Sequence, residues 1–307
     1  MNKSIIALVV VILIGIGVYL FMKDSTPDAV IPSQQNTSTN TTPTTTQNEV
    51  TTPVTEAPVD ETKTVIGKSV NGRDITAYHF GKGETEVLFV GGIHGGYEWN
   101  TVLVAYDLMD YLEKTPTAVP DDVRVTVIPA LNPDGLFKVV GTDGKFTQAD
   151  VPTGTNTTVA GRFNANTVDL NRNFDCDWQA TGKWQNTNVS GGDKAFSEPE
   201  SQAIRNYVDA HELSGVVVWY SAAGGVFASN CHGDVLSETQ VLTTLYAKAS
   251  GYPAHESFDF YAITGDMVNW FAKEKIPAIS VLLTTHEDTE WTKNKAGVEA
   301  ILKHFGN

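Results

Sequence analysis

His94 and Glu98 stand a few residues apart in a glycine-rich segment that directly follows the short apolar run 86–91. Imidazole nitrogens and carboxylate oxygens both ligate metal ions. An open α/β sheet holds its ligands at the carboxyl ends of its strands, and glycines there let backbone approach closely. The pair therefore indicates a metal site at the end of a buried strand, although a histidine near a glutamate is a weak signal by itself.

A second group of polar residues lies in the segment 162–174, which contains Arg162, Arg172 and several asparagines. Buried guanidinium groups suit the bidentate recognition of a carboxylate. Taken alone, the same segment also fits a surface loop with solvated arginines. Its composition therefore indicates carboxylate recognition only if the fold buries these side chains.

The elements that must position these residues alternate between strands and helices. Asn71-Gly72 is a strong two-residue turn signal, which predicts a hairpin over 64–80, and Asn132-Pro-Asp-Gly135 is expected to be another turn. Apolar periodicity predicts the other elements: strands over 86–91, 123–129, 216–219 and 278–283, helices over 101–112, 199–211, 238–249, 267–273 and 293–305, and long loops over 136–195. This order predicts a single α/β domain whose mixed, mostly parallel central sheet carries helices on both faces.

The composition is that of a globular, acidic protein. The 307 residues are 41% hydrophobic and 19% charged, and the formal net charge is −15. Nucleic-acid binding needs a basic face that neutralises phosphates. We therefore expect no nucleic-acid partner.

The first residues predict a membrane anchor. Residues 4–22 form an uncharged run rich in Ile, Val and Leu, and roughly 20 apolar residues cross a bilayer core. A cleaved signal peptide, the alternative, usually has a shorter apolar core and a small-x-small site, whereas this run leads into Phe21-Met22-Lys23-Asp24. We expect a transmembrane signal anchor over 1–24, which places the rest of the chain on the extracytoplasmic side of the cell membrane as a single-pass protein.

The next segment, 25–62, is rich in Thr, Asn and Pro and has almost no large apolar residues. Such a composition cannot offset the entropy of ordering, so we expect a disordered linker. The folded domain is then expected over 63–307.

Four motifs occur in an order that a known family also carries. They are Gly91-Gly-Ile-His-Gly-Gly-Tyr-Glu98, Asn132-Pro-Asp-Gly135, Val168-Asp-Leu-Asn-Arg-Asn-Phe174 and Ser197-Glu-Pro-Glu200. In this respect the chain resembles the zinc metallocarboxypeptidases, with a domain like that of carboxypeptidase A. The resemblance implies a carboxypeptidase-like fold in a monomer, one zinc ion, and a peptide or cell-wall stem-peptide C-terminus as the partner.

The resemblance also assigns the chemical roles. His94 and Glu98 would be two zinc ligands. Arg162 would polarise the scissile carbonyl and stabilise the oxyanion that forms on it.

Substrate recognition follows from the same resemblance. Asn171 and Arg172 would hold the terminal carboxylate, and Tyr261 would close over the substrate. Val268 would sit at the base of the specificity pocket and favour an apolar side chain.

Two positions depart from the family pattern. Tyr220 stands where the resemblance places a histidine as third zinc ligand, and Leu282 stands where it places the glutamate that acts as general base. A tyrosine ligates zinc only as phenolate, starting from a pKa of about 10, and leucine cannot accept a proton. These departures predict weak or displaced zinc and impaired or lost hydrolysis.

Other residues near the expected cleft are candidates for compensation. His286 would share the face of Leu282 if the strand continued, and it could replace the base. His232 could replace the missing ligand, although a loop histidine is the simpler interpretation. Cys176 and Cys231 follow two segments that border the same cleft in the family, which predicts a disulfide between them.

Two functions therefore remain open. One is a zinc exopeptidase that acts on peptide C-termini with impaired hydrolysis. The alternative is a non-catalytic pseudoenzyme that binds peptide C-termini at the cell surface, and a purely structural module is a third, less attractive reading.

Overall fold

The computed structural model describes residues 62–154 and 158–306. The predicted anchor over 1–24 and the predicted linker over 25–62 lie, apart from Thr62, outside the described residues. Within the described ranges no helix is long and apolar enough to cross a bilayer.

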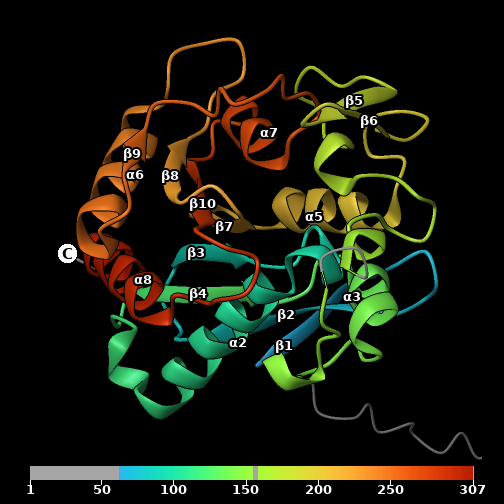
Figure 1. Cartoon of the computed structure of the whole chain (residues 1–307). Coiled ribbons are helices and arrows are strands. Elements are labelled where there is room, and N and C mark those ends of the chain that lie inside the picture. Colours follow the sequence, from blue (N-terminus) through green and yellow to red (C-terminus); the bar gives the residue numbers. More distant parts are fainter. Residues whose placement is uncertain (1–61, 155–157, 307) are drawn as a thin grey trace, which may run out of the picture. The chain divides into compact units, whose positions relative to one another are not determined.

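An eight-stranded mixed sheet forms the centre of the domain, in the order β1-β2-β4-β3-β7-β10-β8-β9 (Figure 1). The four inner strands β4, β3, β7 and β10 run parallel to one another, whereas β1, β2 and β8 pair antiparallel with their inner neighbours. The strands are β1 (Lys63–Lys68), β2 (Asp74–Phe80), β3 (Thr85–Val90), β4 (Val123–Ile128), β7 (Leu213–Ser221), β8 (Gly225–Ala228), β9 (Ala254–His255) and β10 (Ala278–Leu283). The prediction of a single α/β domain with a mixed sheet is confirmed.

Helices cover both faces of this sheet (Figure 1). Alternate residues of β3 show the two faces, because Val87 and Phe89 join one apolar cluster and Leu88 and Val90 join the other. On the first face lie α2 (Trp99–Lys114), α6 (Ser237–Ser250) and α8 (Trp291–Phe305); on the second lie α5 (Pro199–Ala210) and α7 (Met267–Lys273). Both faces of the sheet are buried. This explains why the sequences of the inner strands are continuous runs rich in Val and Ile.

The segment after β4 differs from the prediction of a turn followed by long loops. Helix α3 (Pro133–Val140) begins there, because the Asn132 side chain accepts a hydrogen bond from the Gly135 N–H (2.8 Å) and Pro133 takes the first helical position. The helix ends at Gly141, whose φ of 81° is left-handed. A small hairpin, β5 (Thr181–Trp184) with β6 (Thr187–Ser190), also forms in the region predicted as loop.

Five short 3₁₀ turns complete the domain and carry several of the polar residues of interest. They are η1 (Gly95–Glu98), η2 (Pro116–Ala118), η3 (Gln148–Asp150), η4 (Val159–Gly161) and η5 (Leu170–Arg172). Close packing of η1 on η4 requires glycine at position 95, since a Cβ there would lie 2.7 Å from the Gly161 carbonyl oxygen. This approach brings the segment of His94 and Glu98 next to that of Arg162.

The parallel register of β7 and β10 places positions 220 and 282, which depart from the family pattern, side by side. Leu282 of β10 and Tyr220 of β7 are direct partners across the ladder. β3, on the other side of β7, ends shortly before His94. The carboxyl ends of these three strands therefore converge on one place.

Candidate active site

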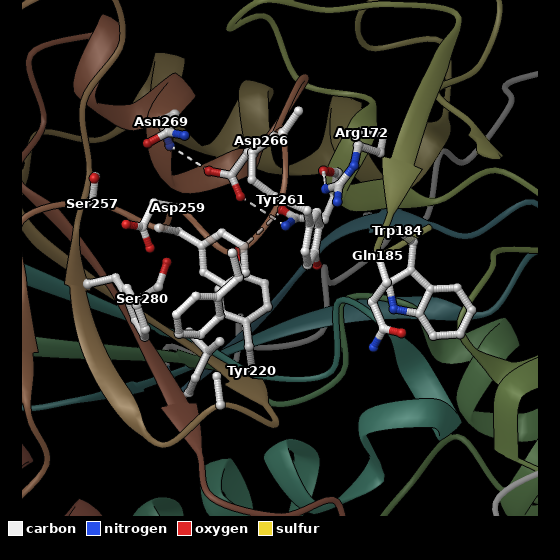
Figure 2. A pocket seen from close by; sticks show the side chains of 18 of the residues that line it. Arg172, Trp184, Gln185, Tyr220, Ser257, Asp259, Tyr261, Asp266, Asn269 and Ser280 are labelled. Atoms are coloured by element: carbon white, nitrogen blue, oxygen red, sulfur yellow. Dashed lines mark hydrogen bonds between the residues drawn. The ribbon is translucent and has the colours of Figure 1, made fainter. Parts of the chain in front are cut away.

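A cavity of about 830 Å³ opens at the carboxyl ends of β3, β7 and β10. It gathers residues from segments far apart in the sequence (Figure 2). Of the residues singled out by sequence, the following line it: His94, Glu98, Arg162, Asn171, Arg172, Tyr220, Tyr261, Leu282, His232, His286, Cys176 and Cys231. Val268 does not belong to the lining.

His94 and Glu98 converge on one point. The Nδ1 atom of His94 lies 2.8 Å from Oε1 of Glu98, but the contact lacks the alignment of a hydrogen bond. Glu98 Oε2 is buried without a hydrogen-bond partner among the described residues. A ring nitrogen and a carboxylate oxygen that lie close together without a hydrogen bond could both ligate one cation.

Asp169 contacts both His94 and Arg162 and holds them in place. It was not among the residues predicted from the sequence. Its Oδ2 accepts hydrogen bonds from Nε and Nη2 of Arg162 (3.0 and 2.8 Å), and its Oδ1 faces Nε2 of His94 at 3.3 Å. Burial alone would raise the pKa of Asp169, but Arg162 and His94 hold it well below its usual value. The available signal was its place inside the Val-Asp-Leu-Asn-Arg-Asn-Phe motif.

Arg162 is fixed with its guanidinium at the cavity wall. Besides its bonds to Asp169, the guanidinium carbon lies 4.5 Å from the ring centre of Trp184 and 5.6 Å from that of Tyr97. The side chain is only 2% exposed, so its charge acts in a poorly solvated place. Such a fixed cation can stabilise an oxyanion that forms in the cavity.

Tyr220 presents a neutral phenol where the resemblance places a histidine ligand. Its hydroxyl donates to Oδ1 of Asn171 at 3.3 Å, and its ring centre lies 5.9 Å from that of His94. Burial, with further contributions from Asp266 and Glu98, raises the pKa of Tyr220 well above 10. Without a cation beside it, Tyr220 is therefore a neutral phenol, and zinc would have to displace its proton.

The residues present do not complete a catalytic zinc site. Three protein ligands and an open fourth position are usual, and here only His94 and Glu98 offer suitable donors. Over the described part of the chain, no group of three or more His, Cys, Asp or Glu side chains is arranged to hold a metal ion. A zinc ion held by two residues would be bound weakly.

Leu282 supplies no proton acceptor. Its side chain lies at the cavity wall, 8% exposed, and packs into the apolar cluster of the second face. Ser280, two residues earlier on the same face of β10, also lines the cavity. This strand therefore contributes apolar and hydroxyl groups where the resemblance places a carboxylate.

The Arg172 side chain is buried in the wall and keeps unused donors. Its Nε and Nη2 donate to the Lys183 carbonyl oxygen (2.9 and 2.7 Å), and its Nη1 donates to the Asn171 carbonyl oxygen. A guanidinium has five N–H groups, so further N–H groups remain to bind an anion in the cavity. Tyr261 lies beside it, with its ring centre 6.0 Å from the guanidinium carbon.

Asn171 is tied into a chain of polar side chains. Its Nδ2 donates to Oδ2 of Asp266 at 2.9 Å, and its Oδ1 accepts from the Met267 N–H (3.1 Å) as well as from Tyr220. Because the Nδ2 group of Asn171 donates to Asp266, it is not directed at a substrate carboxylate bound by Arg172. Asn171 thus has fewer free donors than the resemblance implies.

Val268 does not form the base of a pocket, contrary to the prediction. Val268 is 2% exposed and packs in the core, because it lies in the first turn of α7 on the side that faces the sheet cluster. Asp266, Asp259, Asn269 and Ser280 line this part of the cavity instead (Figure 2). Asp266 caps α7 by accepting the Asn269 N–H at 2.9 Å, and burial raises its pKa.

His286 enters the cavity by another route than a longer strand. β10 ends at Leu283, and the following loop carries His286 to Ser221, with 2.8 Å between Nδ1 and Oγ. His232 faces Asp177 at 2.7 Å in an exposed pair at the rim. No contact joins His232 to His94 or Glu98 among the interactions of the described residues.

Cys176 and Cys231 are joined by a disulfide, with their Cα atoms 6.1 Å apart. Both residues line the cavity. The bond links the segment after Arg172 to the segment after β8, and so closes one side of the cavity wall.

The comparisons with known proteins agree with this fold. The family model for zinc carboxypeptidases matches residues 54–291. This chain therefore belongs to the zinc carboxypeptidase family.

Two curated relatives give the degree of similarity. The chain is 28% identical over 181 residues to carboxypeptidase Z of Rattus norvegicus, over 55% of this chain and 26% of that protein. It is 29% identical over 184 residues to carboxypeptidase M of Mus musculus, over 56% of this chain and 33% of that protein. The chain thus spans about a third or less of the length of these relatives.

Solved structures share the fold. Bovine thrombin-activatable fibrinolysis inhibitor, in complex with tick carboxypeptidase inhibitor, superposes with a TM-score of 0.61 at 15% identity, over 80% of this chain and 88% of that one. The murein-tripeptide amidase MpaA from Escherichia coli O157 superposes with a TM-score of 0.54 at 20% identity, over 80% and 92% of the two chains. At these identities the likeness concerns the fold alone.

Proposed function

We propose that this domain recognises the C-terminal end of peptides and that its capacity for hydrolysis is impaired. The observation that carries the proposal is the Arg172 guanidinium, which is 1% exposed and keeps unused N–H groups at the cavity wall. A buried cation in a cavity of this size needs an anion. A peptide's terminal carboxylate fits it by charge and by bidentate geometry.

Hydrolysis is impaired because of the residues at positions 220 and 282. Tyr220 offers a neutral phenol and Leu282 no proton acceptor, so zinc is held by at most two suitable ligands and water lacks its usual base. General acid–base catalysis is worth about 10²- to 10⁴-fold. The alternative reading, a pseudoenzyme that binds without any hydrolysis, differs only in the residual rate.

The ligand's last side chain is expected to be cationic. The cavity lining contains two carboxylates, the exposed Asp259 and the buried Asp266, and opposite charges attract at short range. A peptide that ends in lysine would place its carboxylate on Arg172 and its ammonium group near these carboxylates.

Calorimetric titration with matched peptides tests the proposal. A peptide with a free C-terminus should bind about 10- to 100-fold more tightly than its C-terminal amide, since hydrogen bonds to charged groups contribute about 1.5–3 kcal/mol. Arg172→Gln should remove that difference, whereas Arg205→Gln, on the outer helix α5, should keep it. Equal affinity of the wild-type protein for acid and amide would refute the proposal; a stem peptide in the same titration tests the cell-wall substrate.

A further inference from the structure

His286 is a half-buried histidine to which the resemblance assigns no role. It follows β10 in the loop 284–290 and lines the cavity together with Glu98 and Arg162. Its ring centre lies 4.6 Å from that of Tyr97, and its Nδ1 lies 2.8 Å from Oγ of Ser221. The ring is therefore held by Tyr97 and Ser221, which also line the cavity.

The hydrogen-bond network fixes which ring nitrogen carries the proton. Asn100 is fully buried, and its Nδ2 donates to the carbonyl oxygens of Thr285 (2.7 Å) and Asp288 (3.0 Å). Its Oδ1 can then only accept, so the Ser221 hydroxyl donates to it at 3.0 Å. Because that hydroxyl has a single proton, Ser221 must accept from Nδ1–H of His286.

Two consequences follow for the chemistry. Ser221 is not an activated nucleophile, since its proton points to Asn100 and not to His286. The neutral imidazole of His286 keeps its free lone pair on Nε2, the nitrogen not held by Ser221. Burial lowers the pKa of His286, an effect that His94 and Arg162 reinforce and Glu98 and Glu287 oppose, so the neutral form prevails near pH 7.

The position of His286 relative to Arg162 suits a reaction at a peptide carbonyl. Tyr97 contacts both residues, with 4.6 Å from ring centre to ring centre on one side and 5.6 Å to the guanidinium carbon on the other. Both groups therefore lie against the same tyrosine and line the same cavity. A peptide carbonyl polarised by Arg162 and a water molecule on His286 would share that cavity.

We propose that His286 is a catalytic residue, the proton acceptor that serves this cavity in place of the carboxylate lost at position 282. Nε2 takes a proton from the water whose oxygen adds to the carbonyl carbon of the last peptide bond, and the oxyanion forms against Arg162. The C–N bond then breaks while His286 returns its proton to the leaving nitrogen. The second proton of the water passes from the intermediate's hydroxyl to the same nitrogen, which leaves a carboxylate and a free amino acid.

This proposal rests on the proposed recognition of peptide C-termini, and it is tested by release of the C-terminal amino acid. The full chain is incubated with an acylated dipeptide that ends in lysine, and wild type is compared with His286→Gln, His286→Ala and His304→Gln, a control on α8 outside the cavity. We expect slow turnover by wild type, a loss of about 100-fold or more in His286→Gln, and no change in His304→Gln. Added imidazole should restore part of the rate to His286→Ala, which a merely structural role would not allow.

Binding and zinc content, measured on the same samples, separate the explanations. Peptide affinity and zinc content should be unchanged in His286→Gln if the histidine acts on water. A parallel fall in zinc content would make His286 a metal ligand and overturn the proposal, as would full activity of His286→Gln, failure of imidazole rescue, or the absence of turnover in wild type. In each of these cases the discrimination between free and amidated peptides still reports on the proposed function independently.

Discussion

At the scale of single residues, the site is a family arrangement with two neighbouring changes. Tyr220 and Leu282 are partners in one parallel ladder, so the positions at which the resemblance places a ligand and a base are neighbours, while Arg162, Asn171 and Arg172 are buried in the wall. Apart from Val268, the residues that the resemblance singled out line one cavity. The resemblance did not predict that the phenol of Tyr220 would bond to Asn171.

Restoring one residue alone is expected to have a limited effect. Tyr220→His should raise zinc content, because it adds the third ligand, but turnover should stay low without a carboxylate at position 282. Leu282→Glu alone should leave zinc content low. Metal analysis and amino-acid release on both single variants measure these effects, and high turnover in either one would contradict the account.

The acidic part of the cavity leads to a prediction about selectivity. Asp259→Asn and Asp266→Asn remove charge with little change in volume, and each should reduce the preference for a C-terminal lysine over a C-terminal leucine. The expected change is about 10-fold in the ratio of dissociation constants, or about 1.4 kcal/mol. Titration with the two peptides checks it; an unchanged or apolar preference would count against a cationic ligand.

At the scale of elements, periodicity predicts the strands and helices that have a strong apolar pattern. β3, β4, β7 and β10 and the long helices lie within a few residues of their predicted ranges. The short strands β8 and β9, the hairpin β5–β6 and helix α3 were missed, because their boundaries depend on tertiary contacts and on the Asn132 cap more than on periodicity. The same reason explains the error at Val268, whose exposure depends on how α7 packs.

The disulfide connects two such irregular segments. Cys176 and Cys231 are 55 residues apart in the chain, and a bond that closes a loop of this size typically contributes about 2–4 kcal/mol. Replacing both cysteines by serine should lower the free energy of unfolding by that amount. Urea denaturation measures it, and wild type under reducing conditions should match the double variant.

A buried carboxylate at the start of β3 makes stability depend on pH. Burial alone would raise the pKa of Glu86, but hydrogen bonds from Thr126, Tyr207 and His211 lower it below 4.5. Because the folded-state pKa lies below the unfolded one, this contribution is present above about pH 4.5 and is lost as the pH falls through the folded-state value.

Glu86→Gln should therefore destabilise the domain by about 1–3 kcal/mol near pH 7. Its loss of stability between pH 6 and pH 3 should also be shallower than that of wild type. Urea denaturation at several pH values provides the comparison. Parallel curves for the two proteins would show that Glu86 does not carry the effect.

At the scale of the whole molecule, the folded domain is one part of a chain whose first residues carry the predicted anchor and linker. We propose that residues 1–24 hold the domain at the extracytoplasmic face of the cell membrane, where the Cys176–Cys231 bond is stable. Membrane fractionation of the full chain and of a chain that starts at residue 63 tests this location. Recovery of the full chain in the soluble fraction would refute the proposal.

We propose that this domain keeps a site for peptide C-termini and lacks efficient hydrolysis because of the residues at positions 220 and 282. The most direct measurement compares zinc content and release of the C-terminal amino acid for wild type and for the double variant Tyr220→His/Leu282→Glu. We predict less than one zinc per chain and slow turnover for wild type, and one zinc with turnover at least about 100-fold higher for the double variant. One zinc per chain in wild type, with turnover equal to that of the double variant, would contradict the account.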